Sequence, residues 1–307
     1  MILPRTDSLT DYCAFGLRIE SEMPLPELTR SDSPAYLGMV PVNVKKSDLS
    51  AMWAEYEPVK ESIALVGRQV LFRIPDTAIF CVDGDSILFS PCEGASEDKI
   101  RLFVLGTCMG IVLMQRQILP LHGSAVAIRG KAYVIAGASG AGKSTLASTL
   151  LGRGCSLLSD DLIAVTLAAD GTPMVMPAYP QQKMWQESID RLGMSSAHLT
   201  PLYDRETKFA VPVPAKFCNE PLPLAGVYEL IKTETTATMK AINGLERFHT
   251  LLNHTFRGFL IDRLGLMEWH FGTLARFVNR IDMYRIKRAS SGFSAHALAD
   301  GLLETIH

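Results

Sequence analysis

The fold is decided by the stretch Ala132-Tyr-Val-Ile-Ala-Gly137-Ala-Ser-Gly-Ala-Gly142-Lys143-Ser144. Its first five residues form a short apolar run that is typical of a buried strand, and residues 144–151 have the composition of a helix. The residues between them match G-x-x-x-x-G-K-[ST], a glycine-rich loop that joins a strand to a helix. The stretch therefore predicts an α/β fold built around a phosphate-binding loop.

Backbone N–H groups in such a loop turn toward one anion, and the following helix adds the positive end of its dipole. The predicted nucleotide-binding residues are Gly137, Ser139, Gly140, Ala141, Gly142, Lys143, Ser144 and Thr145. We expect Lys143, on a solvent-facing cradle, to reach the β- and γ-phosphates, and the Ser144 hydroxyl group to ligate Mg²⁺. The expected cofactors are ATP and Mg²⁺.

Two adjacent carboxylates, Asp160 and Asp161, follow the next apolar run, residues 155–158. If this run is a parallel strand, its carboxyl end delivers both side chains to the crevice beside the phosphate loop. Neighbouring side chains on an extended chain point to opposite sides, so one carboxylate would face Mg²⁺ and the other an acceptor hydroxyl group. We assign the metal to Ser144 and Asp160, while the residues alone leave the order of the two aspartates open. The alternative is that one or both only cap the following turn.

Other signatures of nucleotide and metal sites are missing from the sequence. There is no N-K-x-D segment, by which a GTPase reads guanine, and no S-G-G-Q-like segment of a transporter ATPase. The seven histidines have no spacing that suits zinc, and a lone histidine such as His122 is more often structural than catalytic. Four cations after the loop could clamp a phosphate or a carboxylate, although each alone is more often a solvated surface charge: Lys183, Arg205, Lys208 and Arg257.

The patterning of the chain predicts three parts. Residues 1–92 alternate short apolar runs with turn residues, which predicts a β-rich N-terminal domain. Residues 93–120 contain an apolar segment, residues 102–114, that is too short to cross a membrane and reads as a buried connecting helix. Residues 121–307 form the domain of the phosphate loop, in which the proline-rich stretch 194–224 is expected to be mostly connecting chain and a candidate loop over the site.

The composition of the chain argues against some classes of binding partner and indicates a cellular location. The net charge of -2 provides no basic field for nucleic acid or an acidic membrane surface, so neither is an expected partner. Six cysteines without a C-x-x-C pair, and an N-terminus without the apolar core of a secretion signal, favour the cytoplasm. Whether the chain forms a homo-oligomer is left open by the sequence.

Three segments together resemble the C-terminal kinase domain of HPr kinase/phosphorylase: Leu121-His-Gly-Ser, the glycine-rich loop, and Leu158-Ser-Asp-Asp-Leu-Ile. In that family an H-G pair, a G-x-S-G-x-G-K-S loop and a D-D pair occur in this order at similar distances. The resemblance implies a P-loop, HPr-kinase-like fold for residues 121–307. It also implies a catalytic set in which Lys143 binds phosphate, one aspartate of Asp160 and Asp161 serves Mg²⁺ with Ser144, the other acts as base toward a seryl hydroxyl group, and His122 supports that base.

The sequence departs from this family after the predicted hairpin of residues 163–176. The family's L-E-x-R-G-x-G segment is absent, and Met176-Pro-Ala-Tyr-Pro-Gln-Gln-Lys-Met-Trp185 stands in its place, which points away from HPr as the acceptor. Residues 12–28 and Lys183-Met-Trp185 look instead like the HPr-kinase-related proteins of peptide-modification gene clusters. Among these are kinases that phosphorylate the C-terminal serine of lasso-peptide precursors.

The expected function is therefore that of an ATP-dependent kinase acting on a serine of a peptide or protein. Two alternatives stay open: a phosphotransferase acting on a small hydroxyl compound, and an ATP-binding regulator without an acceptor. The intact lysine, serine and paired aspartates favour an enzyme over the regulator.

Overall fold

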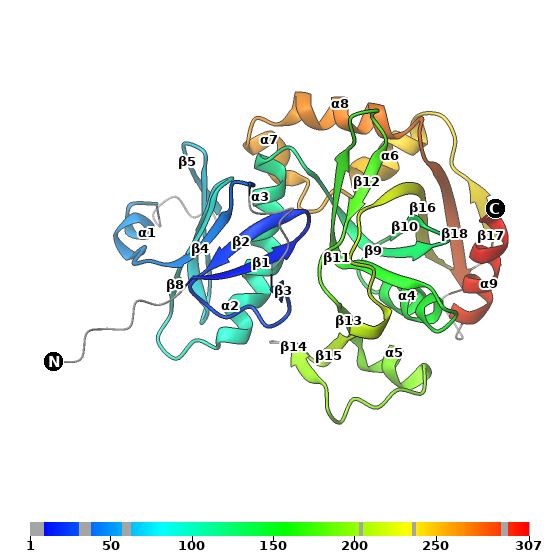
Figure 1. Ribbon diagram of the computed structural model, residues 1–307, viewed down its shortest axis with the longest axis horizontal. Helices are drawn as coiled ribbons and strands as arrows, with labels where there is room; N and C mark the ends of the chain where they lie inside the picture. Colours follow the sequence, from blue (N-terminus) through cyan, green and yellow to red (C-terminus); the bar gives the residue numbers. More distant parts are fainter. Residues whose placement is uncertain are drawn as a thin grey trace. The chain divides into compact units, whose positions relative to one another are not determined.

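The computed structural model describes residues 9–30, 38–56, 63–202, 205–234, 238–289 and 294–306, and within these it is a mixed α/β structure with three sheets (Figure 1). The chain divides into two compact units. Unit 1 is Met1–Ile118 with Phe259–Met267, and unit 2 is Leu119–Gly258 with Glu268–His307. The segment expected to connect two domains, residues 93–120, thus falls almost wholly inside unit 1.

Unit 1 contains a sheet of eight strands in the order β3-β1-β2-β4-β8-β7-β6-β5 within the described residues. Short turns join most neighbours, as the alternation of apolar runs and turn residues predicts; Asp83-Gly84, for example, lies between β7 and β8. The strands are β1 (Thr10–Ala14), β2 (Leu17–Ser21), β3 (Thr29–Arg30), β4 (Val42–Lys46), β5 (Ile63–Val66), β6 (Gln69–Ile74), β7 (Ala78–Val82) and β8 (Ser86–Pro91).

The apolar run of residues 102–114 forms the predicted buried helix of unit 1. It comprises α2 (Glu97–Phe103), a π-helical turn (Val104–Cys108) and α3 (Met109–Gln115). The Phe103 ring lies 6.0 Å from the Phe80 ring of β7, which places the helix against the sheet. Unit 1 also contains the short helices α1 (Ser50–Tyr56) and α7 (Phe259–Arg263). In the part of the chain that the structure describes, no helix is long and apolar enough to span a membrane.

The return of the chain to unit 1 is fixed by a few contacts. Leu260 and Ile261 of α7 are buried, and Arg263 donates a hydrogen bond of 3.0 Å to the main-chain oxygen of Ile63 in β5. Unit 1 is therefore assembled from two stretches of chain that are separated by most of unit 2.

Unit 2 is built on a sheet whose pairing runs in a circle. The antiparallel pairs β10–β9, β9–β11, β11–β12 and β12–β16 lead back to β10 through a parallel β10–β16 pair. Two further strands follow, because β18 pairs parallel to β16 and β17 antiparallel to β18. The strands are β9 (Leu119–Ile128), β10 (Lys131–Ala136), β11 (Ser156–Leu167), β12 (Pro173–Met176), β16 (Leu222–Thr233), β17 (Thr238–Ala241) and β18 (Asp282–Ala289).

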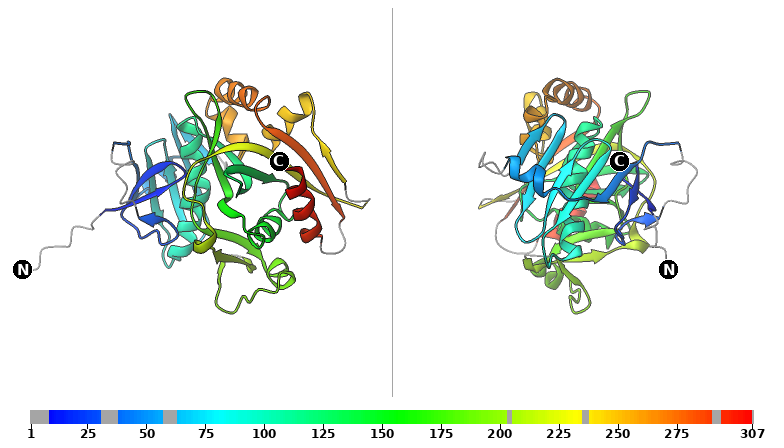
Figure 2. Two further views of the ribbon diagram at one scale, coloured as in Figure 1. Left: turned by 45° about the vertical axis from the view of Figure 1, so that its right-hand side comes forward. Right: turned by 90° about the vertical axis from the view of Figure 1, so that its left-hand side faces the viewer.

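Helices cover two faces of this sheet, each over its own hydrophobic core. On one face α4 (Lys143–Leu151) and α9 (Ala295–Thr305) contribute buried leucines, and on the other α6 (Leu245–Asn253) and α8 (Met267–Phe277) contribute leucines and Phe277 (Figure 2). The helical spacing of residues 245–279, the strand over 283–286 and the hairpin around Asp170-Gly171 are confirmed. The closing helix predicted from residue 293 begins at Ala295; Phe293 lies outside the described residues.

The prediction that residues 194–224 are mostly connecting chain is wrong. They contain β14 (Thr200–Leu202) and β15 (Arg205–Pro212), which form a small sheet with β13 (Gln181–Trp185) in the order β13-β15-β14, flanked by α5 (Gln186–Arg191). Proline is tolerated here because Pro201 lies on the edge strand and Pro212 is the last residue of its strand, where a missing N–H group does little harm.

Candidate functional site

The predicted order of strand, loop and helix is confirmed, because β10 ends at Ala136 and α4 begins at Lys143. Three glycines of the loop have positive φ angles: Gly137 at 149°, Gly140 at 74° and Gly142 at 104°. A Cβ atom on Gly137 would lie 2.5 Å from the main-chain oxygen of Leu230 in β16, so no other residue fits without moving the strand. The glycine pattern is therefore required by backbone angle and by space.

Lys143 is folded back over the loop. Its Nζ donates to the main-chain oxygens of Gly137 at 2.9 Å and Ala138 at 3.1 Å, and the residue is only 9% exposed. Burial lowers the pKa of its ammonium group, an effect that the nearby carboxylates oppose. The prediction of a solvent-facing lysine is wrong, because the loop's own carbonyl groups hold the ammonium group in place. The positive charge of Lys143 nevertheless lies at the phosphate-binding loop, as predicted.

The other predicted loop residues surround this lysine. Ala138, Ser139 and Gly140 are exposed at the tip, whereas Ala141 is buried. At the start of α4, the Thr145 hydroxyl group lies 2.7 Å from the Ser188 hydroxyl group of α5.

Asp160 is buried beside the start of α4. Its Oδ1 accepts hydrogen bonds from the hydroxyl groups of Ser124 at 2.5 Å and Ser144 at 3.1 Å, and its Oδ2 accepts from the main-chain N–H of Lys183 at 2.7 Å. Burial raises the pKa of this carboxyl group, although the hydrogen bonds from Lys183 and Ser124 act in the other direction. The structure thus brings together the two residues predicted to bind the metal, Ser144 and Asp160.

Asp161 faces a different set of groups. Its Oδ2 lies 2.7 Å from Nζ of Lys183, and its Oδ1 lies 3.5 Å from Nδ1 of His122, with 27% of the side chain exposed. Burial alone would raise the pKa of this carboxyl group, but the ammonium group of Lys183, helped by His122, holds it well below its usual range. Asp161 therefore remains ionised while its neighbour Asp160 is biased toward protonation.

His122 is held in one tautomer. Its Nδ1 lies 2.9 Å from the main-chain oxygen of Asp161, and since a carbonyl oxygen only accepts, Nδ1 carries the proton. Burial, and then the charge of Lys143, lower the pKa of the ring, so the neutral form is favoured and Nε2 keeps its lone pair. The main-chain N–H of His122 donates to the oxygen of His254 at 2.7 Å. The histidine implied by the family resemblance thus contacts Asp161, and its supporting role stays a prediction.

The aspartates do not lie at the end of a parallel strand, so that prediction is wrong. β11 continues through both of them to Leu167 and is antiparallel to β9 and to β12. They meet the loop because Gly123 of β9 pairs with Asp161 on one side and with Ala136, the last residue before the loop, on the other. Asp161 has a positive φ angle of 75°, but β11 continues past both aspartates, so no turn directly follows them for a cap.

The sequence names Lys183 only as one of four candidate cations, and the structure places it against both aspartates. It is 8% exposed, and burial alone would lower the pKa of its ammonium group, but Asp161, together with Tyr179 and Asp160, raises this pKa above its usual value. The charge of Lys208 also reaches the site, since it contributes to the lowered pKa values of Asp161 and Lys143, and its ammonium group lies 5.5 Å from the centre of the Trp185 ring. Arg257 instead lies over Phe256, and the side chain of Arg205 is outside the described part of the chain.

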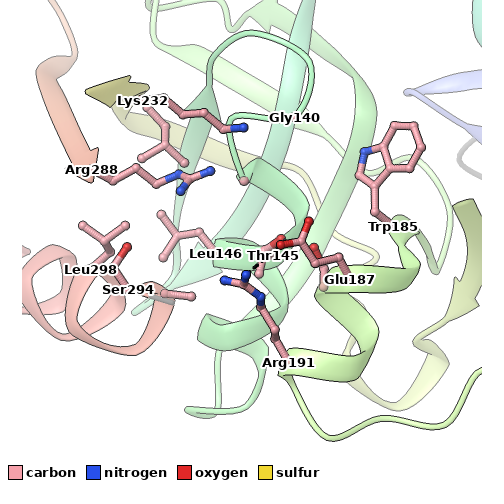
Figure 3. Close-up of a pocket in the computed structure, with 14 residues that line it drawn as sticks. Gly140, Thr145, Leu146, Trp185, Glu187, Arg191, Lys232, Arg288, Ser294 and Leu298 are labelled. Carbon is pink, nitrogen blue, oxygen red and sulfur yellow. Dashed lines mark hydrogen bonds and ion pairs between the residues drawn. The ribbon is translucent and has the colours of Figure 1, made fainter. Parts of the chain in front are cut away.

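A cavity of about 280 Å³ adjoins the loop (Figure 3). Gly140, Gly142 and Thr145 belong to both the loop region and the cavity lining. Lys232 points toward Gly140, whereas Arg288 lies against Gly142, and Nε of Arg288 donates to the main-chain oxygen of Ala141 at 2.6 Å. The rest of the wall includes Leu146, Trp185, the ion pair of Glu187 with Arg191, and Leu298. A cavity with two cations at the loop and apolar walls beyond it suits an anion that carries an organic group.

The donor set at the loop suits Mg²⁺. At the start of α4, Oγ of Ser144 lies 3.1 Å from Oδ1 and 3.2 Å from Oδ2 of Asp160. All three atoms are oxygens, the ligands that Mg²⁺ prefers. Mg²⁺ takes one or two protein carboxylates and completes its shell with water and phosphate oxygens, so a larger protein cluster is not required. Over the described residues, no group of three or more His, Cys, Asp or Glu residues could hold a metal.

No protein-family model matches the sequence, and no curated protein sequence matches it. Among solved structures, the chain is similar to the Hpr(Ser) kinase/phosphatase from Coxiella burnetii. The identity is 14% and the TM-score 0.32, and the match covers 60% of this chain and 93% of that chain.

Proposed function

We propose that the protein is an ATP-dependent kinase that transfers the γ-phosphoryl group to a serine hydroxyl group of a peptide or protein. One observation carries the proposal: two adjacent carboxylates at a glycine-rich phosphate loop contact different groups. Asp160 lies with Ser144, whereas Asp161 is kept ionised by Lys183. Phosphoryl transfer requires such a division, with one group toward the metal and one toward the acceptor.

In this proposal each residue has one task. The loop N–H groups and Lys143 bind the β- and γ-phosphates, and Ser144 and Asp160 hold Mg²⁺, which when bound neutralises phosphate charge. Asp161 accepts a hydrogen bond from the acceptor hydroxyl group and orients its oxygen toward the γ-phosphorus. A carboxylate of such low basicity orients the hydroxyl group first and receives its proton as the new bond forms. His122, neutral and bonded to the Asp161 main chain, keeps this carboxylate in place.

The cavity beside the loop supports ATP rather than phosphate alone. Its cations Lys232 and Arg288 adjoin the loop, and its apolar walls extend past Leu146 to Leu298, which suits a nucleoside attached to the phosphates. A reaction that consumes ATP is consistent with a cytoplasmic location, which we also propose.

The acceptor that we propose is a peptide serine, such as the C-terminal serine of a lasso-peptide precursor. Support comes from the sequence, in which the missing L-E-x-R-G-x-G segment argues against HPr and the segments at residues 12–28 and 183–185 resemble peptide-modifying relatives. A strand-rich unit 1 is also more protein than a nucleotide site requires, and its sheet offers strand edges to an extended peptide.

The test is mass spectrometry of peptides after incubation with the full chain, ATP and Mg²⁺. We expect a precursor peptide with a C-terminal serine to gain one phosphoryl group, and the same peptide ending in alanine to gain none. The Asp161→Asn variant serves as the inactive control. Phosphorylation of small hydroxyl compounds alone would favour the alternative phosphotransferase, and ATP binding without any acceptor would favour a regulator.

The full chain is needed for this experiment. A shortened protein that begins near residue 93 would keep α2 and α3 but lose the sheet against which Phe103 packs. The apolar face of that helix would then be exposed, and the shortened protein could lose peptide phosphorylation because it misfolds and not because it fails to bind the peptide.

A further inference from the structure

The small sheet β13-β15-β14 has two different faces. Side chains alternate between the faces of a strand, and those of one face form a hydrophobic core with α5: Met184, Phe209 and Val211. Lys183 and Trp185 of β13 lie on the other face, and Lys208 of β15 joins them because it pairs with Trp185. Nζ of Lys183 lies 2.7 Å from Oδ2 of Asp161, so this second face is directed toward the candidate site.

Lys208 is held at a defined place on this face. Its ammonium group lies 5.5 Å from the centre of the Trp185 ring, and the residue is half-buried. Lys208 is also the diagonal neighbour of Lys183, a position that separates two residues by roughly 7–8 Å. Its charge helps to lower the pKa of the Asp161 carboxyl group, so it lies within electrostatic reach of that carboxylate. The aromatic ring thus positions a cation near Asp161.

The phosphates of a bound nucleotide have cations of their own, at the loop and at the cavity wall. Figure 3 shows Trp185 on the opposite side of Gly140 from two of these cations, Lys232 and Arg288. Since Lys208 is held by Trp185, it lies apart from both. Lys208 is therefore placed to meet the acceptor, whereas Lys232 and Arg288 are placed to meet the nucleotide.

We propose that Lys208 is a specificity-determining residue, which binds a carboxylate group next to the hydroxyl group of the acceptor. This role rests on the proposed function, in which Asp161 orients that hydroxyl group. In a C-terminal serine the hydroxyl oxygen and the carboxylate are only a few bonds apart, so one residue meets both Asp161 and Lys208. Without a cation at this place, the aspartates and the phosphates would repel the carboxylate.

The carboxylate has two sources in peptides. One is the C-terminus of a chain that ends in serine, and the other is the side chain of an aspartate that directly follows the serine. An ammonium group on a flexible stem recognises either, because it is a point charge without a fixed fork geometry. The experiment therefore has one arm for each source.

The test compares three N-acetylated peptides that bind to the full chain in the presence of Mg²⁺ and a non-hydrolysable ATP analogue. Each has five alanines followed by serine: the first ends in the free carboxylate of the serine, the second in the serine amide, and the third in an aspartate amide after the serine. Ligand-observed NMR gives the dissociation constants.

We expect the free acid to bind at least about tenfold more tightly than the serine amide. This ratio corresponds to about 1.4 kcal/mol, a modest value for a hydrogen bond between charged groups. Tight binding of the third peptide would add acidic side chains to the substrate class, and weak binding would restrict the class to C-terminal serine.

Variants assign this preference to one side chain. Lys208→Met should weaken the free acid to the affinity of the amide and leave the amide unchanged, and Lys208→Gln replaces this variant if it does not fold. Lys208→Arg keeps the charge and the contact with the ring, so it should keep the preference. The matched control is Lys131→Met, an exposed lysine at the end of β10 opposite the loop, which should leave the affinities of all three peptides unchanged.

Equal affinities of the free acid and the amide, binding of neither, or a preference that survives Lys208→Met would each overturn the role of Lys208. So would a loss of affinity for the ATP analogue in this variant with peptide affinities kept, because Lys208 would then serve the phosphates. All these affinities are measured without phosphoryl transfer. A chain that prefers the free acid but transfers no phosphoryl group to it from ATP, as judged by mass spectrometry, would therefore contradict the proposed kinase and keep the carboxylate site.

Discussion

The ammonium group of Lys183 lies 2.7 Å from Oδ2 of Asp161, while the main-chain N–H of the same lysine donates at 2.7 Å to Oδ2 of Asp160. One residue thus contacts both carboxylates through different atoms. A substitution removes the contact of its side chain with Asp161 and keeps the contact of its main chain with Asp160. The two carboxylates can therefore be perturbed separately.

We predict that Lys183→Met shifts the pH dependence of phosphoryl transfer. Without the ammonium group, burial is the main influence on Asp161, so its pKa rises from below to above the usual value of about 3.9. The acid limb of kcat/KM should move to higher pH by at least about one unit. A profile that coincides with that of the parent would show that Asp161 is not the group that titrates.

We predict that Asp160→Asn and Asp161→Asn have different effects. Asp160 lies with Ser144, so its loss should raise the Mg²⁺ concentration needed for half-maximal rate. Asp161 is the residue that we propose to orient the acceptor hydroxyl group, so its loss should lower kcat by roughly 10²–10⁴ with nucleotide affinity kept. Titration of Mg²⁺ against rate for both variants decides this, and two near-parental profiles would contradict it.

We predict that Gly137→Ala destabilises the protein far more than Gly140→Ala. Both glycines have positive φ angles, but only at Gly137 would a Cβ atom approach a main-chain oxygen, that of Leu230, to 2.5 Å. At Gly140 the nearest atom is Nζ of Lys232 at 3.9 Å, so the cost is the backbone angle alone, about 1 kcal/mol. Thermal unfolding of both variants measures the difference. Equal shifts in Tm would contradict the close approach of Gly137 to the main chain of Leu230.

We predict that Lys143→Met lowers phosphoryl transfer by at least about 10²–10³, the typical loss on removal of one group that stabilises developing charge. The fold should remain, because the change removes a buried ammonium group whose pKa burial already lowers. The matched control is Lys232→Met, a cation of the cavity wall, which should raise KM for ATP more than it lowers kcat. Equal kinetic effects of the two variants would contradict a special role for the loop lysine.

The sequence predicts the loop well and its surroundings poorly, for physical reasons. Gly137 to Ser144 and the hairpin around Asp170 are local, because their angles and spacing lie within a few consecutive residues. The position of Asp161 depends instead on Gly123 of β9, which lies between β10 and β11, and no local pattern encodes such a pairing.

Lys183 illustrates the same limit. It lies 22 residues from Asp161 in the sequence and reaches it only because β13 packs beside β11. Its neighbours in the chain are those of an ordinary strand lysine. The proline content of residues 194–224 also misled the prediction, because proline at strand ends and on edge strands does not prevent pairing.

The return of the chain to unit 1 at Phe259–Met267 determines when that unit can be completed during synthesis. Residues 119–258 must leave the ribosome first, which at about 5–20 residues per second takes on the order of ten seconds. During that interval the eight-stranded sheet lacks α7, so the surface that Leu260 and Ile261 help to fill is open. Nascent chains that end before residue 259 should therefore bind chaperones more strongly than chains that extend past residue 267.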